Sequence, residues 1–394
     1  MSVSVKMREA VRGGSMVRKM FEEGLRLKQQ FGADQVFDYS LGNPDLEPPP
    51  KFKGEIIRLL QADSPGIHGY MPNAGIPSVR EKLAAYLSGQ HGLKIGPGNV
   101  LMTVGAAGAL NVALKTVADF GDEVLVLAPY FMEYNFYADN HGARVTVAQT
   151  DAAFRPDPVK ISAAITSKTR ALLINSPNNP AGVVYTEGEL KTIGDILRAK
   201  SKELGRPVVL VADEPYRKIV YDGLTVPSVF QAYENSVVVS SFSKDLSLAG
   251  ERVGFLCANP ALKDCEEFMS AATLCNRILG FVNAPALMQR AVSEMLDDQV
   301  DVGVYQERVR TLSRGLREIG YKVSETQGTF YLFPESPVPD DFGFVETLKK
   351  ELILAVPGSG FSRPGHFRLS LCLDAEKIKR SLPGFERAIK NVKK

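Results

Sequence analysis

The segment SVVVSSFSKDLSLAGERVGFLC (residues 236–257) contains two apolar runs joined by a polar turn. Both runs are apolar throughout rather than alternating, which is typical of strands buried on both faces of a sheet. Similar runs precede it, so that the expected strands cover residues 99–104, 123–128, 170–175, 207–212, 236–241 and 252–257. Helical patterns lie between them. This alternation predicts an α/β fold with three layers, α/β/α, around a mostly parallel central sheet.

Two of the expected helices carry clear start signals. Thr186 and Glu189 have the spacing of a capping box and precede an apolar helical face. Pro77 suits the first turn of a helix, because its missing N–H has no partner there in any case.

Both ends of the chain differ from this alternating centre. The N-terminal part leads into the proline-rich segment LGNPDLEPPP, and the C-terminal part holds long helical patterns around a hairpin-like GTFYLF. We therefore expect a large domain over residues 49–287 and a smaller α+β domain built from residues 1–48 and 288–394.

The composition is that of a globular protein, with 394 residues, 44% hydrophobic and 23% charged. The 47 Lys and Arg against 45 Asp and Glu leave no basic footprint for nucleic acid. No apolar run is long enough for a membrane span, and the N-terminus does not resemble a signal peptide. The four cysteines lack metal-binding spacing, so we expect free thiols and no metal. A cytoplasmic protein is expected.

The sharpest candidate site follows the strand at 236–241. Ser241, Ser243 and Lys244 stand just beyond it, and Arg252 lies eight residues further on. Ligands of open α/β sheets bind at the carboxyl ends of strands. Two hydroxyls and a guanidinium suit a phosphate, while a lysine amine is a nucleophile. The alternative interpretation is ordinary surface charge.

Further candidates lie at other strand ends. Asp213 ends an apolar strand and needs a cationic partner if it is buried, although a helix N-cap is the alternative. Asn179 belongs to the turn NSPNNPAG, which would present side-chain amides. The small residues of GAAG at the start of a helix would allow a phosphate to approach its N–H groups, with close packing as the alternative; they are Gly105, Ala106, Ala107 and Gly108.

Taken in order, these motifs resemble one family. The sequence resembles the pyridoxal-phosphate-dependent class I/II aminotransferases of fold type I. The motifs that carry the resemblance are SxSK, GxRxG, DEPY, NNPAG, the segment around Tyr70 and FRLS (367–370). The resemblance extends roughly from residue 41 to residue 368. No single motif is specific for this family, but the occurrence of all six in this order is.

The resemblance implies a role for each matching cofactor-binding residue. Lys244 would be the catalytic lysine that binds the pyridoxal 5'-phosphate aldehyde, and Asp213 would pair with the ring nitrogen. Tyr216 and Asn179 would hydrogen-bond the ring oxygen, and Tyr130 would stack on the ring. The phosphate would be held by Ser241, Ser243, Arg252, the backbone at Gly105, Ala106 and Ala107, and Tyr70 from a neighbouring subunit.

For the substrate, Arg368 would bind the α-carboxylate, helped by Asn179 and the backbone at Gly42. The resemblance therefore implies ping-pong transfer of an amino group from an L-amino acid to a 2-oxo acid, with aspartate and 2-oxoglutarate as one candidate pair. It also implies a homodimer with shared active sites. The same motifs would serve a C–S lyase or a decarboxylase, which stays an alternative. Arg277 is either a ligand of a distal substrate carboxylate or a surface residue.

Overall fold

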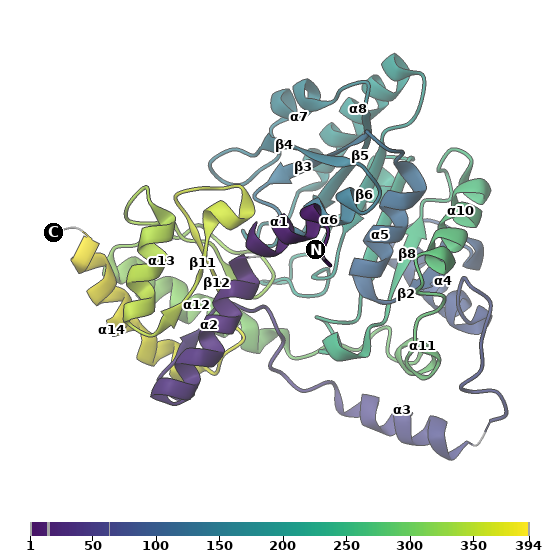
Figure 1. The fold of residues 1–394 in the computed structure, drawn as a ribbon. Helices are drawn as coiled ribbons and strands as arrows, with labels where there is room; N and C mark the ends of the chain where they lie inside the picture. The colour runs from purple at the N-terminus through teal and green to yellow at the C-terminus, as the bar shows by residue number, and fades with distance from the viewer. Residues whose placement is uncertain (1, 14–15, 63, 393–394) are drawn as a thin grey trace.

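The structure, a computed structural model, describes residues 2–13, 16–62 and 64–392. Within these residues, a central sheet of seven strands has the order β2-β8-β7-β6-β5-β3-β4 (Figure 1). The strands from β7 to β4 run parallel, and β8 is antiparallel to both neighbours. They are β2 (Val100–Thr103), β3 (Glu123–Ala128), β4 (Arg144–Gln149), β5 (Thr169–Asn175), β6 (Val209–Asp213), β7 (Ser236–Ser241) and β8 (Gly254–Ala258).

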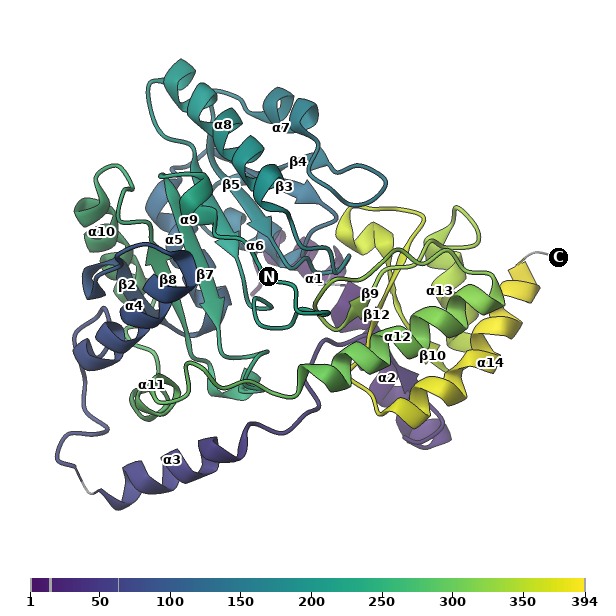
Figure 2. The ribbon, with the colours of Figure 1, turned by 180° about the vertical axis from the view of Figure 1, so that it is seen from behind.

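The helices associated with this sheet are α4 (Pro77–His91), α5 (Gly105–Val117), α6 (Glu133–Asp139), α7 (Pro158–Ala164), α8 (Glu187–Leu204), α9 (Val229–Ala232), α10 (Cys265–Ile278) and α11 (Ala286–Ser293). Val209 and Val211 of β6 pack in an apolar cluster with α5 and α10, whereas Leu210 and Ala212 pack in another with α4 and α8. Because successive β6 residues are apolar on both sides, helices cover both faces of the sheet. The predicted α/β/α architecture is confirmed (Figure 2).

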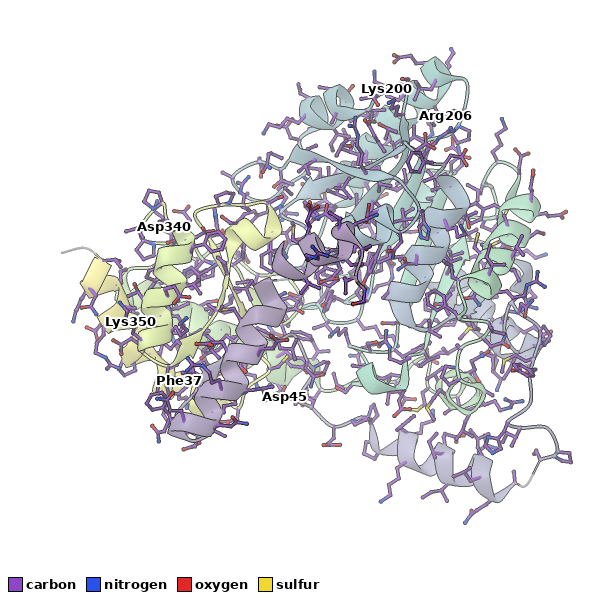
Figure 3. All side chains as sticks on the ribbon, in the orientation of Figure 1. Phe37, Asp45, Lys200, Arg206, Asp340 and Lys350 are labelled. Carbon is purple, nitrogen blue, oxygen red and sulfur yellow. The ribbon has the colours of Figure 1, made fainter. Side chains whose placement is uncertain are left out.

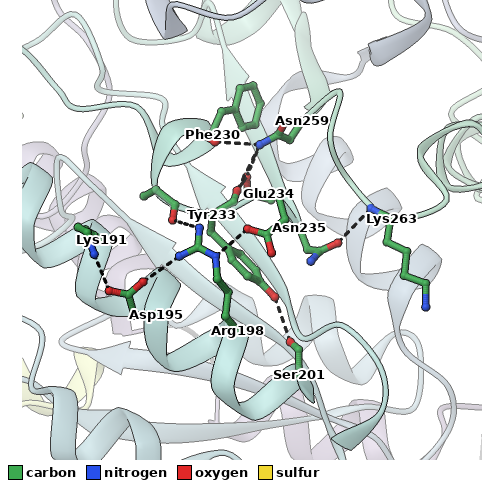
Figure 4. Close-up of polar contacts among 12 residues, drawn as sticks. Lys191, Asp195, Arg198, Ser201, Phe230, Tyr233, Glu234, Asn235, Asn259 and Lys263 are labelled. Atoms are coloured by element: carbon green, nitrogen blue, oxygen red, sulfur yellow. Dashed lines mark hydrogen bonds and ion pairs between the residues drawn. The ribbon is translucent and has the colours of Figure 1, made fainter. Parts of the chain in front are cut away.

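Helix α8 begins as its capping pattern predicts. The Thr186 hydroxyl accepts a hydrogen bond from the Glu189 N–H, and the Glu189 carboxylate accepts one from the Thr186 N–H. Figure 4 shows how α8 is tied to the segment that precedes β7: Arg198 donates to the Ala232 carbonyl and to the Glu234 carboxylate. These contacts fix the helix against the sheet.

A smaller part of the molecule combines both ends of the chain (Figures 1 and 2). Strand β1 (Phe37–Asp38) pairs with β10 (Ile353–Leu354), and β12 (Phe367–Ser370) lies between β11 (Val356–Pro357) and β9 (Tyr331–Leu332). The helices here are α2 (Met16–Phe31), α12 (Val302–Ile319), α13 (Asp341–Lys350) and α14 (Ala375–Val392). GTFYLF forms no hairpin, because β9 pairs with the distant β12.

The remaining elements are α1 (Val5–Gly13), α3 (Pro50–Gln61) and the short 3-10 helices η1 (Pro97–Asn99), η2 (Ala249–Glu251) and η3 (Gly358–Phe361). Helix α1 reaches α6 through an ion pair of Lys6 with Asp139, at 2.6 Å. On the segment leading to α3, Asp45 (labelled in Figure 3) pairs with Arg308 of α12 at 2.8 Å. Helix α3 lies away from the sheet, against α11 (Figure 1).

The sequence did not predict β4. It is an edge strand of the sheet, and of its six residues three are exposed and one is buried, so it lacks the apolar run that marks the inner strands. In the described ranges no helix combines the length and apolarity that membrane crossing requires. Nor do three or more His, Cys, Asp or Glu side chains of these ranges gather where a metal ion could bind.

Candidate active site

A cavity of about 530 Å³ lies where the carboxyl ends of β5, β6 and β7 meet the first turns of α5 and α6. This edge of the sheet is where open α/β folds bind ligands. The structure brings most of the residues expected from the sequence to its wall: Gly42, Ala106, Ala107, Asn179, Asp213, Tyr216, Ser241, Ser243, Lys244, Arg252 and Arg368.

Asp213, the last residue of β6, is buried at the base of the cavity. Its Oδ2 accepts a hydrogen bond of 2.6 Å from the Tyr134 hydroxyl. Its Oδ1 is buried and has no hydrogen-bond partner among the described residues. Burial raises the pKa of Asp213 to about 7, against the opposing hydrogen bond from Tyr134. The free oxygen is therefore suited to an N–H donor of a ligand, above all a cationic one.

Lys244 follows β7 and is partly buried in the cavity wall. Its Nζ donates a hydrogen bond of 2.8 Å to the Gly42 carbonyl. Burial lowers the pKa of Lys244 to about 8, and the positive charges of Arg368 and Arg252 act in the same direction. A lysine with such a pKa is partly neutral near physiological pH, as a nucleophile or a proton acceptor must be.

The expected anion-binding groups meet at the start of α5. Gly105 has a φ of +76°, and a Cβ there would lie 2.9 Å from Arg252 Nη2. Glycine is thus required both by the backbone and by the approach of the guanidinium. Although Gly105 does not itself line the cavity, it begins the turn whose N–H groups lack helical acceptors. Together with Ser241 and Ser243 these groups could bind a phosphate.

Arg368, on β12, enters the cavity from the smaller part of the molecule and is 2% exposed. Its Nη1 donates to Asn179 Oδ1 at 3.1 Å and its Nη2 to the Ser40 carbonyl at 2.7 Å. The guanidinium lies between the rings of Tyr331 and Phe361, at 4.6 and 4.9 Å from their centres. Its Nε has no partner among the described residues. A fixed planar guanidinium with a free donor is suited to a carboxylate.

Several residues of the cavity wall had no individual role assigned from the sequence. Tyr134 and Tyr331 reach it from α6 and β9, and Asn175 ends β5. Asn175 links neighbouring motifs: its Nδ2 donates to the Asp213 carbonyl at 2.7 Å, and its Oδ1 accepts from the Asn179 N–H at 2.6 Å. Asn175 opens the NSPNNPAG turn, so its position at a strand end was a usable signal. The two tyrosines had none.

The aromatic residue expected over the cofactor lies elsewhere. Tyr130 is buried and its hydroxyl donates to Asn135 Oδ1 at 3.1 Å, but it is not among the residues that line the cavity. Its neighbour Phe131 does line the cavity. These two residues follow the end of β3, and only the second of them faces the cavity.

Two further expected residues lie outside the cavity of this chain. Tyr70 is 96% exposed, in the connection between α3 and α4. Arg277, near the end of α10, is exposed and does not line the cavity.

Comparison with known proteins identifies the family. The model of the family described as "Aminotransferase class I and II" matches residues 34–383 of this chain. Aspartate/prephenate aminotransferase of Thermus thermophilus is 31% identical over 373 residues, covering 93% of this chain and 94% of the relative. Among solved structures, an aminotransferase of Eubacterium rectale has a TM-score of 0.97 at 37% identity, with both chains covered fully. Aspartate aminotransferase of Thermus thermophilus with maleate has a TM-score of 0.86 at 28% identity, covering 98% and 100%.

These matches span nearly the whole chain and include the segments that form the cavity. They favour transamination over the lyase and decarboxylase alternatives. The protein is an enzyme that transfers amino groups between amino acids and 2-oxo acids with pyridoxal phosphate as its cofactor. The chain belongs to the class I and II aminotransferases.

Proposed function

We propose that this aminotransferase acts through Lys244, Asp213 and Arg368, with aspartate as amino donor and 2-oxoglutarate as acceptor. The observation that carries the proposal is that these three charged groups line one cavity, two of them with a free polar atom. A buried polar group without a partner is costly, so a ligand that satisfies both of these atoms would be stabilised in this cavity.

Pyridoxal phosphate fits this set of groups. A protonated ring nitrogen would satisfy the buried Oδ1 of Asp213 and hold that carboxyl ionised. The phosphate would bind Ser241, Ser243, Arg252 and the first N–H groups of α5. When bound, the cofactor supplies an electron-withdrawing ring that stabilises negative charge at the substrate Cα.

The cavity wall supplies the remaining contacts to the ring. Tyr216, which is buried, and Asn179 would hydrogen-bond the ring oxygen. Phe131, rather than Tyr130, would cover the face of the ring, because it is the aromatic side chain at the cavity. These contacts set the ring plane, and with it the orientation of the substrate bonds that react.

Lys244 is proposed to hold the cofactor covalently and then to move the proton at the substrate Cα. Its low pKa favours both tasks, because the neutral amine is the form that attacks a carbonyl carbon and accepts a proton. The Gly42 carbonyl holds Nζ at 2.8 Å when the amine is free. One side chain thereby serves as anchor and as proton carrier.

Arg368 is proposed to bind the α-carboxylate of the substrate. Asn179 and the Ser40 carbonyl orient the guanidinium, and the rings of Tyr331 and Phe361 lie close to it. A carboxylate bound in this way presents the bonds of Cα in a fixed direction to Lys244. Gly42 lies beside the same site.

We also propose a homodimer and the domain division 49–287 against 1–48 with 288–394. The dimer is supported by Tyr70, which is 96% exposed, and by Ile57 and Leu60 of α3, which are 44% and 54% exposed. A second subunit would cover these apolar side chains and could receive Tyr70 at its phosphate site.

The donor is tested by mixing the loaded enzyme with single amino acids and following the absorption of the cofactor. Aspartate should convert the cofactor to its amine form, and 2-oxoglutarate should convert it back. Aspartate is proposed because relatives from Thermus thermophilus and Pyrococcus horikoshii carry it in their names. If another amino acid reacts and aspartate does not, the proposal of aspartate as the donor is wrong. If no amino acid reacts, the roles assigned to the site residues are wrong. Arg277→Ala that loses aspartate turnover but keeps alanine turnover would identify the ligand of the distal carboxylate.

A further inference from the structure

Tyr331 connects three parts of the proposed site. It lies in β9 and is 3% exposed. Its hydroxyl is 3.0 Å from the Tyr216 hydroxyl, and Arg368 Cζ is 4.6 Å from the centre of its ring. A Cβ at Gly42 would overlap the Tyr331 hydroxyl. The hydroxyl therefore occupies the space that any other residue at position 42 would fill.

The contact with Gly42 extends to Lys244, because the Gly42 carbonyl accepts the hydrogen bond from Nζ. The titratable groups that face Tyr331 are Arg368, Tyr216 and Cys372. Burial raises the pKa of Tyr331, against the opposing effects of Arg368 and the hydrogen bond with Tyr216. Tyr331 thus keeps its proton and can donate it.

We propose that Tyr331 is a positioning residue, whose hydroxyl directs the Tyr216 proton to the cofactor and whose ring orients Arg368 for the substrate carboxylate. The inference rests on the proposed function, since it takes Tyr216 to face the ring oxygen and Arg368 to bind the carboxylate.

The role of the hydroxyl follows from the direction of hydrogen bonds. Either oxygen of the Tyr331–Tyr216 pair can donate. A negatively charged ring oxygen beside Tyr216 attracts the Tyr216 proton, so Tyr331 donates to the Tyr216 oxygen. Each hydrogen bond in such a chain polarises the next one. Tyr331 therefore strengthens the bond from Tyr216 and stabilises negative charge on the ring oxygen.

The role of the ring follows from its distance to the buried guanidinium. Arg368 Cζ lies over the ring of Tyr331, 4.6 Å from its centre, and over the ring of Phe361, 4.9 Å from its centre. Cation–π attraction is strongest for desolvated pairs, and Arg368 is 2% exposed. The rings thus hold the plane of the guanidinium, while Nε has no partner among the described residues.

Two substitutions separate these roles. Tyr331→Phe removes the hydroxyl and keeps the ring, and Tyr331→Met removes both while filling similar space. Each loaded variant is titrated to find the pH at which the absorption of bound pyridoxal phosphate changes. Each is also assayed for KM and kcat with the amino donor. Tyr321→Phe is the matched control, because its buried hydroxyl donates to the Phe385 carbonyl outside the cavity.

Both Tyr331 variants should raise the pH at which the absorption of the bound cofactor changes by about half a unit or more. The reason is that negative charge on the ring oxygen is then less well stabilised by hydrogen bonding. Tyr331→Met should also raise KM about threefold to tenfold, while Tyr331→Phe keeps KM within about twofold. Tyr321→Phe should change neither quantity. If Tyr331→Phe does not fold, the midpoint is taken from Tyr331→Met.

Tyr216→Phe distinguishes the failure of this inference from the failure of the proposed function. It should raise the midpoint further, and adding Tyr331→Phe to it should have no additional effect. If Tyr216→Phe raises the midpoint and Tyr331→Phe does not, Tyr331 is not a positioning residue although the proposed function stands. If Tyr216→Phe has no effect, Tyr216 does not face the ring oxygen, and both fail. An additive double variant also overturns the inference.

Discussion

The Tyr134 hydroxyl donates a hydrogen bond of 2.6 Å to one carboxylate oxygen of Asp213 and leaves the other without a partner among the described residues. The two residues come from α6 and from the end of β6, and both line the cavity. One oxygen is thus fixed by the protein, and the second is available to the cofactor. This asymmetry orients the carboxylate before anything binds.

Tyr134→Phe should weaken the binding of pyridoxal phosphate about tenfold or more. A hydrogen bond to a charged acceptor contributes about 1.5–3 kcal/mol, and Asp213 must be ionised to pair with the ring nitrogen. The dissociation constant is measured by adding cofactor to the cofactor-free chain. Tyr305→Phe is the control, because its hydroxyl has no hydrogen-bond partner in the described residues. Equal affinities of the wild type and Tyr134→Phe would show that Tyr134 does not support the charge of Asp213.

The cofactor-free enzyme should lose stability from pH 5 to pH 7 because of Asp213. Its folded-state pKa is raised to about 7 from 3.8, so the folded chain holds a proton that the unfolded chain has released. The contribution is present in full below about pH 4 and lost as the pH rises through 7. The free energy of unfolding of the wild type relative to Asp213→Asn should fall by about 2 kcal/mol over this window. A difference that is constant with pH would contradict the raised pKa.

Substitutions at residues 130 and 131 should have different effects on the cofactor. Phe131→Leu removes an aromatic face from the cavity and should weaken cofactor binding about threefold to tenfold. Tyr130→Phe removes a hydroxyl that bonds Asn135 and should leave the affinity within about twofold. Both are measured by cofactor titration. The reverse order of effects would restore Tyr130 as the residue over the ring.

Two inactive variants should complement each other if Tyr70 acts across a dimer. Chains carrying Lys244→Ala lack the catalytic amine, and chains carrying Tyr70→Ala lack the contact offered to the partner. In a mixed dimer, one site combines Lys244 of one chain with Tyr70 of the other and is intact. Mixing the two variants should therefore restore activity, with at most one functional site in each mixed dimer. No gain over the separate variants, with mixed dimers present in sedimentation, would show that Tyr70 does not serve the partner.

The fold could be predicted because its inner strands are marked by burial on both faces. The expected limits of β3 and β7 coincide with those observed, and Thr186 caps α8 as the sequence indicates. The edge strand β4 was missed because three of its six residues are exposed, which removes the apolar signal. GTFYLF was misinterpreted because the pairing of β9 with β12 depends on chain segments far apart in the sequence.

The site could be predicted where a motif ends a strand. Asp213 ends β6 and Lys244 follows β7, whereas Arg368 lies within β12 and was expected only from the family resemblance. The structure places all three at one cavity. Tyr134 and Tyr331 could not be found in this way, because their importance arises from tertiary contacts with Asp213 and Tyr216. Tyrosines within a helix or a short strand look the same whether they serve a core or a site.

The central claim is that Lys244 is the residue that holds the cofactor. It is tested most directly by reducing the loaded enzyme with borohydride, which fixes a lysine–cofactor bond, and by mapping the modified peptide by mass spectrometry. The account predicts one pyridoxyl phosphate group per chain, on the peptide that contains Lys244, and none on Lys244→Ala. A label on a different lysine, or the same labelling of Lys244→Ala, would contradict it.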